Sequence, residues 1–263
     1  MSDEQQLVTE RRGHVLLVRI NRPEQRNAMN GAVMAGIGRA MLTADSDPDI
    51  RAVVLTGTGE KAFCAGMDLK AFASGDMGPE ASDTEAMTAF SAFLSGESTC
   101  KVPVIAAAQA TAVAGGLELV LACDLAVVAE NAKVGLPEVK RGLFAAGGGM
   151  YLARRIPLAK ALELTLTGEY ITPAEAAQLG LINAVAPAEE VVDKAIALAE
   201  KIAENGPLGV QASKQLVRAA AFEPVAEVKK AHAEAVGTVF ASADAKEGAT
   251  AFAERRAPQW TGK

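Results

Sequence analysis

Short apolar segments that alternate with helical ones constrain the fold of this chain more than any other feature. Residues 15–21, 52–56, 101–109 and 125–129 are rich in Val, Ile, Leu and Ala, and they fit buried strands. Between the first two, residues 28–44 carry apolar side chains at helical spacing. Strands that alternate with helices indicate crossover connections, so the sequence predicts a largely parallel sheet covered by helices.

The second half of the chain reads as mostly helical. Thr172, Pro173 and Glu175 form a helix start, with Thr as the N-cap, Pro in the first turn and Glu three residues after the cap. Strand patterns stop at about residue 200, and further helices are predicted over residues 189–204, 207–221, 224–240 and 243–255. We therefore predict a sheet-based core over residues 1–200 and a C-terminal helical region over residues 201–263.

Composition excludes several classes of protein. The net charge is −6 and the Lys and Arg residues are scattered, so no basic surface for nucleic acid is expected. Three cysteines without a C-x-x-C pair argue against a disulfide framework or a zinc site and favour a reducing compartment. Because no apolar stretch approaches about 20 residues and the N-terminus does not resemble a targeting signal, we expect a soluble cytoplasmic protein without a membrane partner.

Residues 112–123, AVAGGLELVLAC, combine a buried helix with a carboxylate. The run is apolar on every side after its glycines, but Glu118 lies in its first turns. An unpaired buried carboxylate is costly, so Glu118 either caps the helix start, pairs with a base or serves a function. Gly115 and Gly116 stand at the same helix start, where free N–H groups suit a developing negative charge; a plain tight turn is the alternative.

Two further segments carry candidate functional groups. Residues 61–70, KAFCAGMDLK, follow a predicted strand, and the small residues at 65 and 66 would expose a backbone N–H group. In residues 134–142, VGLPEVKRG, Pro137 reads as the first position of a helix and Glu138 lies in its first turn. Taken alone, this Pro-Glu pair is ordinary helix-start chemistry.

Together these segments resemble the enoyl-CoA hydratase/isomerase (crotonase) superfamily in order and spacing, over nearly the whole chain. The resemblance implies an α/β chain with the ClpP/crotonase-like fold, a spiral of ββα units followed by a C-terminal helical region. It also implies a homotrimer or a homohexamer built as a dimer of trimers. The small apolar residues Ala231, Ala235, Val239 and Ala243 would suit the subunit contact, with packing inside the chain as the alternative. The matching segments are NRP (21–23), RNA (26–28), AFCAGMDL (62–69), AGGLEL (114–119), LPEV (136–139), LTG (166–168), AAQLGLI (176–182) and EG (247–248) with Phe252.

The resemblance assigns roles to named positions. The backbone N–H groups of Met67 and Gly115 would hold the thioester oxygen. Glu118 and Glu138, spaced as in the hydratases, would share the catalytic water, with Glu118 as base toward water and Glu138 as acid toward C2. The coenzyme A carried by the substrate would lie against the 22–28 turn and the 65–70 loop, with no other cofactor and no metal. Its candidate contacts are Arg22, Arg26, Ala28, Ala65, Met67, Asp68, Leu69, Lys70 and Gly115. Solvated surface charge is the alternative for Arg22, Arg26 and Lys70.

The implied activity is that of a lyase of fatty acid metabolism, an enoyl-CoA hydratase. A Δ3–Δ2-enoyl-CoA isomerase, a carnitinyl-CoA-type dehydratase or a non-catalytic acyl-CoA-binding or RNA-binding relative are alternatives. An isomerase would leave the second glutamate without a role, and the negative net charge opposes RNA binding.

The chain departs from the family pattern at two places. Ala114 replaces the first of three glycines, and Ala145 and Ala146 stand where Pro and Gly are common. A methyl group at the second place would crowd the water or the acyl tail. We expect Phe72, residues 74–97 and Phe144 to wall the acyl pocket.

Overall fold

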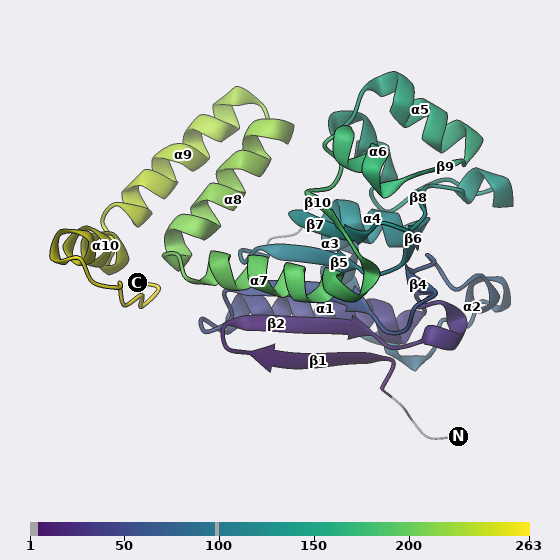
Figure 1. Ribbon diagram of the computed structural model, residues 1–263, viewed down its shortest axis with the longest axis horizontal. Helices are drawn as coiled ribbons and strands as arrows, with labels where there is room; N and C mark the ends of the chain where they lie inside the picture. The colour runs from purple at the N-terminus through teal and green to yellow at the C-terminus, as the bar shows by residue number, and fades with distance from the viewer. Residues whose placement is uncertain (1–4, 98–99) are drawn as a thin grey trace.

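Two sheets stacked along a spiral form the body of the protein (Figure 1). The computed structural model describes residues 5–97 and 100–263. The large sheet has the order β1-β2-β3-β5-β7-β10 and the small sheet the order β4-β6-β8-β9. The strands are β1 (Leu7–Arg12), β2 (Val15–Ile20), β3 (Ala52–Gly57), β4 (Ala62–Cys64), β5 (Val104–Ala108), β6 (Thr111–Val113), β7 (Leu125–Ala129), β8 (Val134–Gly135), β9 (Tyr170–Ile171) and β10 (Ala184–Ala186).

The strand pairing confirms the predicted spiral of ββα units. Strands β3, β5 and β7 lie parallel in the large sheet, and the strands that follow them, β4, β6 and β8, lie parallel in the small one. Strands β2, β3, β5 and β7 are the four that the sequence predicts. Most of the other strands have two or three residues, too few for an alternation of apolar and polar side chains to be recognised. The outer part of β1 is exposed and shows no such alternation.

The helices begin and end close to the predicted positions. The longer ones are α1 (Gly31–Ser46), α3 (Thr84–Leu94), α4 (Gly115–Ala122), α5 (Leu158–Thr167), α7 (Val191–Ala203), α8 (Pro207–Phe222), α9 (Val225–Val239) and α10 (Ala243–Glu254); the short ones include α2 (Leu69–Ser74), α6 (Pro173–Gln178), η3 (Glu138–Arg141) and η4 (Gly149–Arg154). Thr172 caps α6 by accepting a hydrogen bond from Glu175 N, as predicted. Helix α1 begins later than predicted because Asn30 is its N-cap and Met29 pairs with Met67 instead.

The buried core lies between the large sheet and its helices. Helix α7 covers one face of the large sheet and α1, packed on α3, covers the other (Figure 1). Every residue of β3 and β5 is buried, as expected for central strands of a parallel sheet. Buried helix α4 lies between this sheet and the small one, and all eight of its residues are buried.

The C-terminal helices α8, α9 and α10 project from this body (Figure 1). Helix α9 contains no buried residue. Helix α8 is tied to the body through Asp124, whose carboxylate pairs with Lys214 Nζ and Arg218 Nε, each at 2.8 Å. Residue 200, the predicted boundary, lies inside α7, and the projecting part begins at α8. Among the described residues, no helix is long and apolar enough to cross a bilayer.

Candidate active site

A loop of three glycines holds the buried carboxylate of Glu118. Glu118 lies in the first turn of α4 and is 5% exposed. Its Oε1 accepts hydrogen bonds from the N–H groups of Gly147, Gly148 and Gly149 at 2.8, 2.9 and 3.0 Å. Three donors on one oxygen suit an ionised carboxylate. Glu118 neither caps α4 nor pairs with a base among the described residues, so both of those interpretations are wrong.

The glycines matter because the backbone comes close to the carboxylate. A Cβ atom on Gly147 would lie 2.9 Å from Glu118 Oε2, and one on Gly149 would lie 2.3 Å from the Cβ of Ala145. Ala145 packs against the core and Ala146 is exposed. The glycine run was the sequence signal for this loop, but nothing in the sequence showed that it faces Glu118.

Glu138 differs from Glu118 in its hydrogen bonding. It lies in η3, and both of its carboxylate oxygens are buried without a hydrogen-bond partner among the described residues. Burial raises the pKa of Glu138 to about 7; the partial positive charge of its own backbone N–H group opposes the shift, and the negative charge of Glu118 adds to it. Buried, unpaired carboxyls with a raised pKa are concentrated at functional sites.

The N–H groups of Met67 and Gly115 lie in adjoining segments. Neither donates a hydrogen bond to any described backbone or side-chain acceptor. A Cβ atom on Gly66 would lie 3.0 Å from Gly115 N, so the two segments approach closely. Met29 fixes the first segment, because its N–H donates to Gly66 O and its carbonyl accepts from Asp68 N. Two unsatisfied donors at a helix start suit a developing oxyanion.

Ala114, beside this pair of donors, has a backbone conformation that favours glycine. Its φ is 53° and its ψ is −132°, and it is the N-cap of α4. Its Cβ would also lie only 2.7 Å from a Cβ on Gly66, so residue 66 must be glycine. The replacement of glycine by alanine at position 114 therefore carries backbone strain.

The structure brings together the 22–28 turn and the 65–70 loop. Ala65 N donates to Arg26 O at 3.1 Å, and Arg22 bridges to both sides by donating to Ala28 O at 2.5 Å and to Asp68 Oδ2 at 3.0 Å. The side chains of Arg22 and Asp68 are only 13% and 16% exposed. Burial tends to raise the pKa of Asp68, but the hydrogen bonds from Arg22 and from the N–H groups at the start of α2 lower it overall. This pairing points to a role in joining the segments.

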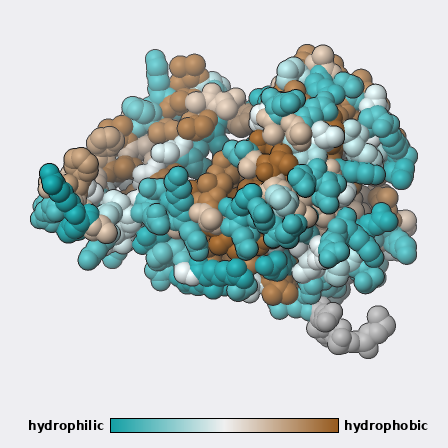
Figure 2. Space-filling model, viewed as in Figure 1, coloured by the Kyte–Doolittle hydropathy of each residue, from teal (hydrophilic) through white to brown (hydrophobic). Residues whose placement is uncertain are grey.

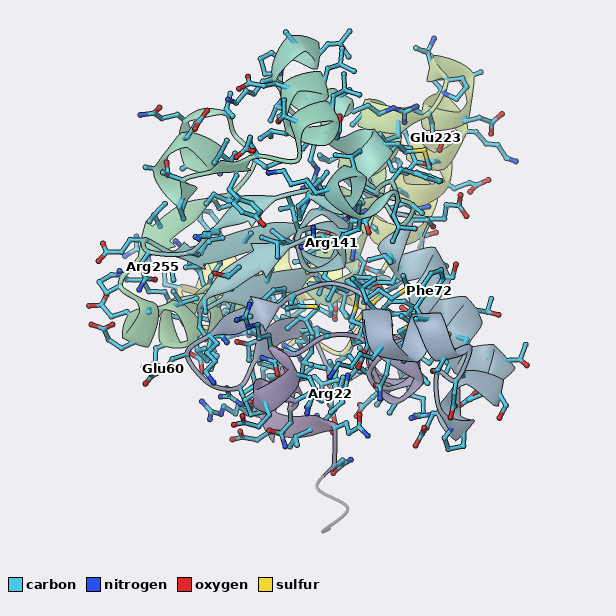
Figure 3. The ribbon with its side chains drawn as sticks, turned by 90° about the vertical axis from the view of Figure 1, so that its right-hand side faces the viewer. Arg22, Glu60, Phe72, Arg141, Glu223 and Arg255 are labelled. Carbon is cyan, nitrogen blue, oxygen red and sulfur yellow. The ribbon has the colours of Figure 1, made fainter. Side chains whose placement is uncertain are left out.

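The other two predicted phosphate contacts remain available. Arg26 and Lys70 are exposed and form no ion pair with a described residue. Figure 3 shows Arg22 on the side of the molecule that also carries Phe72 and Arg141. Leu69 and Phe72 in α2 are 43% and 52% exposed beside Lys70. Asn27, for which we predicted no role, is fully buried; its Oδ1 accepts from Arg22 N and its Nδ2 donates to Thr58 O and Ala62 O.

No group of three or more His, Cys, Asp or Glu side chains within residues 5–97 and 100–263 is arranged to hold a metal ion. The chemistry of the described site is that of backbone donors beside a carboxyl pair. A double-sheet ββα spiral with such a site defines the crotonase-fold class of acyl-CoA enzymes.

Comparison with known proteins narrows this class to a family. The chain matches the family described as enoyl-CoA hydratase/isomerase over residues 10–263, and it belongs to that family. Enoyl-CoA hydratase EchA19 of Mycobacterium tuberculosis is 43% identical over 263 residues, which cover 96% of this chain and 95% of that protein. Carnitinyl-CoA dehydratase of Salmonella typhi is 37% identical over 258 residues, 96% of this chain and 97% of that protein. The crystal structure of enoyl-CoA hydratase EchA1 from Mycobacterium marinum has a TM-score of 0.90 and 42% identity, covering 99% of this chain and all of that one.

Proposed function

We propose that the protein is an enoyl-CoA hydratase, which adds water reversibly and with syn geometry across the 2,3 double bond of an enoyl-CoA thioester. The observation that carries the proposal is the contrast between Glu118, held by three N–H donors, and Glu138, buried without a partner among the described residues. Hydration needs one carboxylate that is ionised and one that is protonated, and such contrasting environments separate these roles.

Each of the four site residues carries out a different part of the hydration reaction. Glu118 takes a proton from water as the water oxygen attacks C3. The charge that develops on the thioester oxygen is stabilised by the N–H groups of Met67 and Gly115, each worth about 2.7–4 kcal/mol in comparable sites. Glu138 delivers its proton to C2. Water is thereby added across the double bond, Glu118 ends protonated and Glu138 ionised, and exchange with solvent restores both.

Carnitinyl-CoA-type dehydration is the second candidate, because dehydration runs the same steps in reverse and the carnitinyl-CoA dehydratases are 37% identical. A Δ3–Δ2-enoyl-CoA isomerase needs a single proton shuttle. The second buried carboxyl, Glu138, therefore favours hydratase or dehydratase chemistry over isomerisation.

The coenzyme A part of the substrate would lie along the joined 22–28 and 65–70 segments. Arg26 and Lys70 are exposed and available for its phosphates, whereas Arg22 is engaged with Asp68. Ala28, Ala65 and Leu69 would contact the carrier through backbone and small side chains. The proposed reaction calls for no cofactor beyond the coenzyme A that the substrate brings.

We also propose that the chain assembles as a homotrimer or as a dimer of trimers. Phe240 and Phe252, at the end of α9 and in α10, are 79% and 88% exposed, and Figure 2 shows apolar residues along the C-terminal helices. A subunit contact would cover them. Ala231, Ala235 and Val239 line a cavity toward α8 instead, which fits the alternative of packing inside the chain. A mass measured by light scattering tests this, and a monomer would contradict it. The cytoplasmic location stays a prediction.

The activity is tested by substrate comparison. Purified protein is mixed with crotonyl-CoA, and the ultraviolet absorbance of the conjugated thioester is followed, with a 3-enoyl-CoA in a parallel assay. We expect crotonyl-CoA to be hydrated, and faster than the 3-enoyl-CoA is isomerised. Faster isomerisation would favour the isomerase, and tight binding without turnover of either substrate would favour a non-catalytic acyl-CoA-binding protein.

A further inference from the structure

A large cavity lies directly behind the glycine loop that holds Glu118. It has a volume of about 720 Å³, within the range of small-molecule pockets, roughly 300–1,000 Å³. Gly148 and Leu94, the last residue of α3, form its inner end, and helices α8 and α9 form its outer walls. Figure 2 shows apolar residues in the hollow between the C-terminal helices and the body, and Glu223, labelled in Figure 3, lies on the cavity wall at the end of α8.

Leu94 lies beside both this cavity and the carboxylate of Glu118. A Cβ atom on Gly147 would lie 2.5 Å from Leu94 Cδ2 and 2.9 Å from Glu118 Oε2, so the two side chains flank the same point of the loop. The carbonyl oxygen of Leu94 would lie 2.7 Å from a Cβ on Gly148. One flexible apolar side chain therefore borders both the site of chemistry and a cavity whose surface is mostly apolar.

The walls suit a hydrocarbon. Lys214 and Arg218, the cations on the α8 wall, are both engaged in ion pairs with the single carboxylate of Asp124. Most of the cavity surface is apolar. On α8 and α9 the apolar part comes from Leu208, Ala212, Phe222, Ala231, Ala235 and Val239, which lie beside the polar side chains of Gln211, Gln215, Glu223, Glu234 and Thr238. Each methylene group moved from water to such surroundings strengthens binding about fourfold.

We propose that this cavity receives the distal part of the acyl group, and that Leu94 is the partition that sets how readily long acyl chains reach it. The inference rests on the proposed hydratase function and names the substrate class of that site as enoyl-CoA thioesters with long acyl groups. Phe72 and Phe144, which the sequence suggested as pocket walls, do not line this cavity; residues 94–97 of the predicted 74–97 wall do.

The test blocks the cavity from its far wall. In Ala235→Trp an indole would fill the space from α9, far from Glu118, and in Ala233→Trp the same side chain would point away, because residue 233 is exposed and does not line the cavity. We expect Ala235→Trp to lower the ratio of kcat/KM for trans-2-hexadecenoyl-CoA to that for crotonyl-CoA by about tenfold or more. Leu94→Ala should raise the ratio and Leu94→Phe should lower it, while Ala233→Trp keeps the wild-type ratio.

Binding gives a readout that does not need turnover. Calorimetry with hexadecanoyl-CoA and butanoyl-CoA should show that Ala235→Trp weakens the long ligand about tenfold more than the short one. Unchanged ratios and affinities in both Ala235→Trp and the Leu94 variants would overturn the inference, while hydration of crotonyl-CoA would leave the proposed function standing. Selective loss of hexadecanoyl-CoA binding in a protein that hydrates nothing would support the cavity and refute the hydratase.

Discussion

Glu118 and Glu138 face the same site in opposite hydrogen-bonding states. Oε1 of Glu118 accepts three backbone N–H groups, whereas neither oxygen of Glu138 has a partner among the described residues. The negative charge of Glu118 contributes to the raised pKa of Glu138, so the two carboxyls are electrostatically coupled. With its pKa raised to about 7, Glu138 carries a proton in about half of the molecules at neutral pH.

The pH dependence of kcat/KM should be the same in the two directions of the reaction. Burial raises the pKa of Glu138 to about 7, and hydration needs its protonated form, so kcat/KM for hydration should fall as the pH rises through 7. Addition of water to the double bond takes up no net proton, so the equilibrium constant does not vary with pH and kcat/KM for dehydration must fall over the same interval. Rate profiles for crotonyl-CoA and for the 3-hydroxyacyl-CoA product test this, and profiles that stay flat through pH 7 would contradict the role given to Glu138.

The same shift links Glu138 to stability. The pKa is raised in the folded state, so the favourable contribution of the neutral carboxyl is fully present below the unfolded value near 4.5 and is lost as the pH rises through about 7. Glu138→Gln removes the ionisation and should raise the unfolding midpoint above the wild type at alkaline pH. Urea unfolding of both proteins at pH 6 and pH 9 measures the difference between their midpoints. A larger increase in the midpoint of Glu138→Gln at pH 6 than at pH 9 would contradict the prediction.

Ala114→Gly should stabilise the protein. The strained backbone at φ 53° and ψ −132° costs about 1–3 kcal/mol, and the added flexibility of glycine in the unfolded chain returns about 0.4–1 kcal/mol of this. We expect a net gain of about 1 kcal/mol in the free energy of unfolding. Ala233→Gly, in the exposed interior of α9, is the matched control and should instead lose up to about 1 kcal/mol. Equal losses in both variants would show that Ala114 is not strained.

Gly147→Ala should impair turnover more than binding. The new methyl group would meet both Leu94 and Glu118 Oε2, so the carboxylate would be displaced from its donors. A misplaced base costs on the order of 100-fold in kcat, whereas the coenzyme A segments are untouched. Gly209→Ala is the control, because nothing lies within 4 Å of its added Cβ. A wild-type kcat in Gly147→Ala would refute the role given to the loop.

Arg26→Ala and Lys70→Ala should weaken recognition of the nucleotide. Loss of a phosphate contact should raise KM for crotonyl-CoA by about threefold to tenfold, with less effect at high salt because exposed charges are screened. A crotonyl thioester of N-acetylcysteamine lacks the phosphates and should be unaffected. Lys230→Ala in α9 controls for a general change of charge. Equal effects on both thioesters would show that these side chains do not act by binding the phosphates.

Much of this fold follows from the sequence because its longer elements carry strong patterns. Leu125–Ala129 and the helix ends around Thr172 and Pro207 were predicted almost to the residue, since apolar runs and caps are local signals. The small sheet was not predicted residue by residue, because its strands are too short for a period to appear. Those strands place α4 and the Met67 loop together.

The site was predicted in part. Glu118, Glu138, Met67 and Gly115 could be named from spacing within a familiar pattern, but their environments could not. Arg22 lies 46 residues from Asp68 in sequence, and Glu118 lies 29 to 31 residues from its glycine donors. Such long-range contacts leave no local trace, so the ion pair of Arg22 and the contrast between the two glutamates required the structure.

The most direct test of the account measures crotonyl-CoA hydration by Glu118→Gln, Glu138→Gln and the double variant, with the exposed Glu60→Gln as control. Each single variant should lose about 10²–10⁴-fold in kcat while still binding a saturated acyl-CoA. The double variant should be little slower than the slower single one, because the two carboxyls act as a unit. Wild-type turnover in either single variant, with Glu60→Gln also unchanged, would contradict the two-glutamate mechanism.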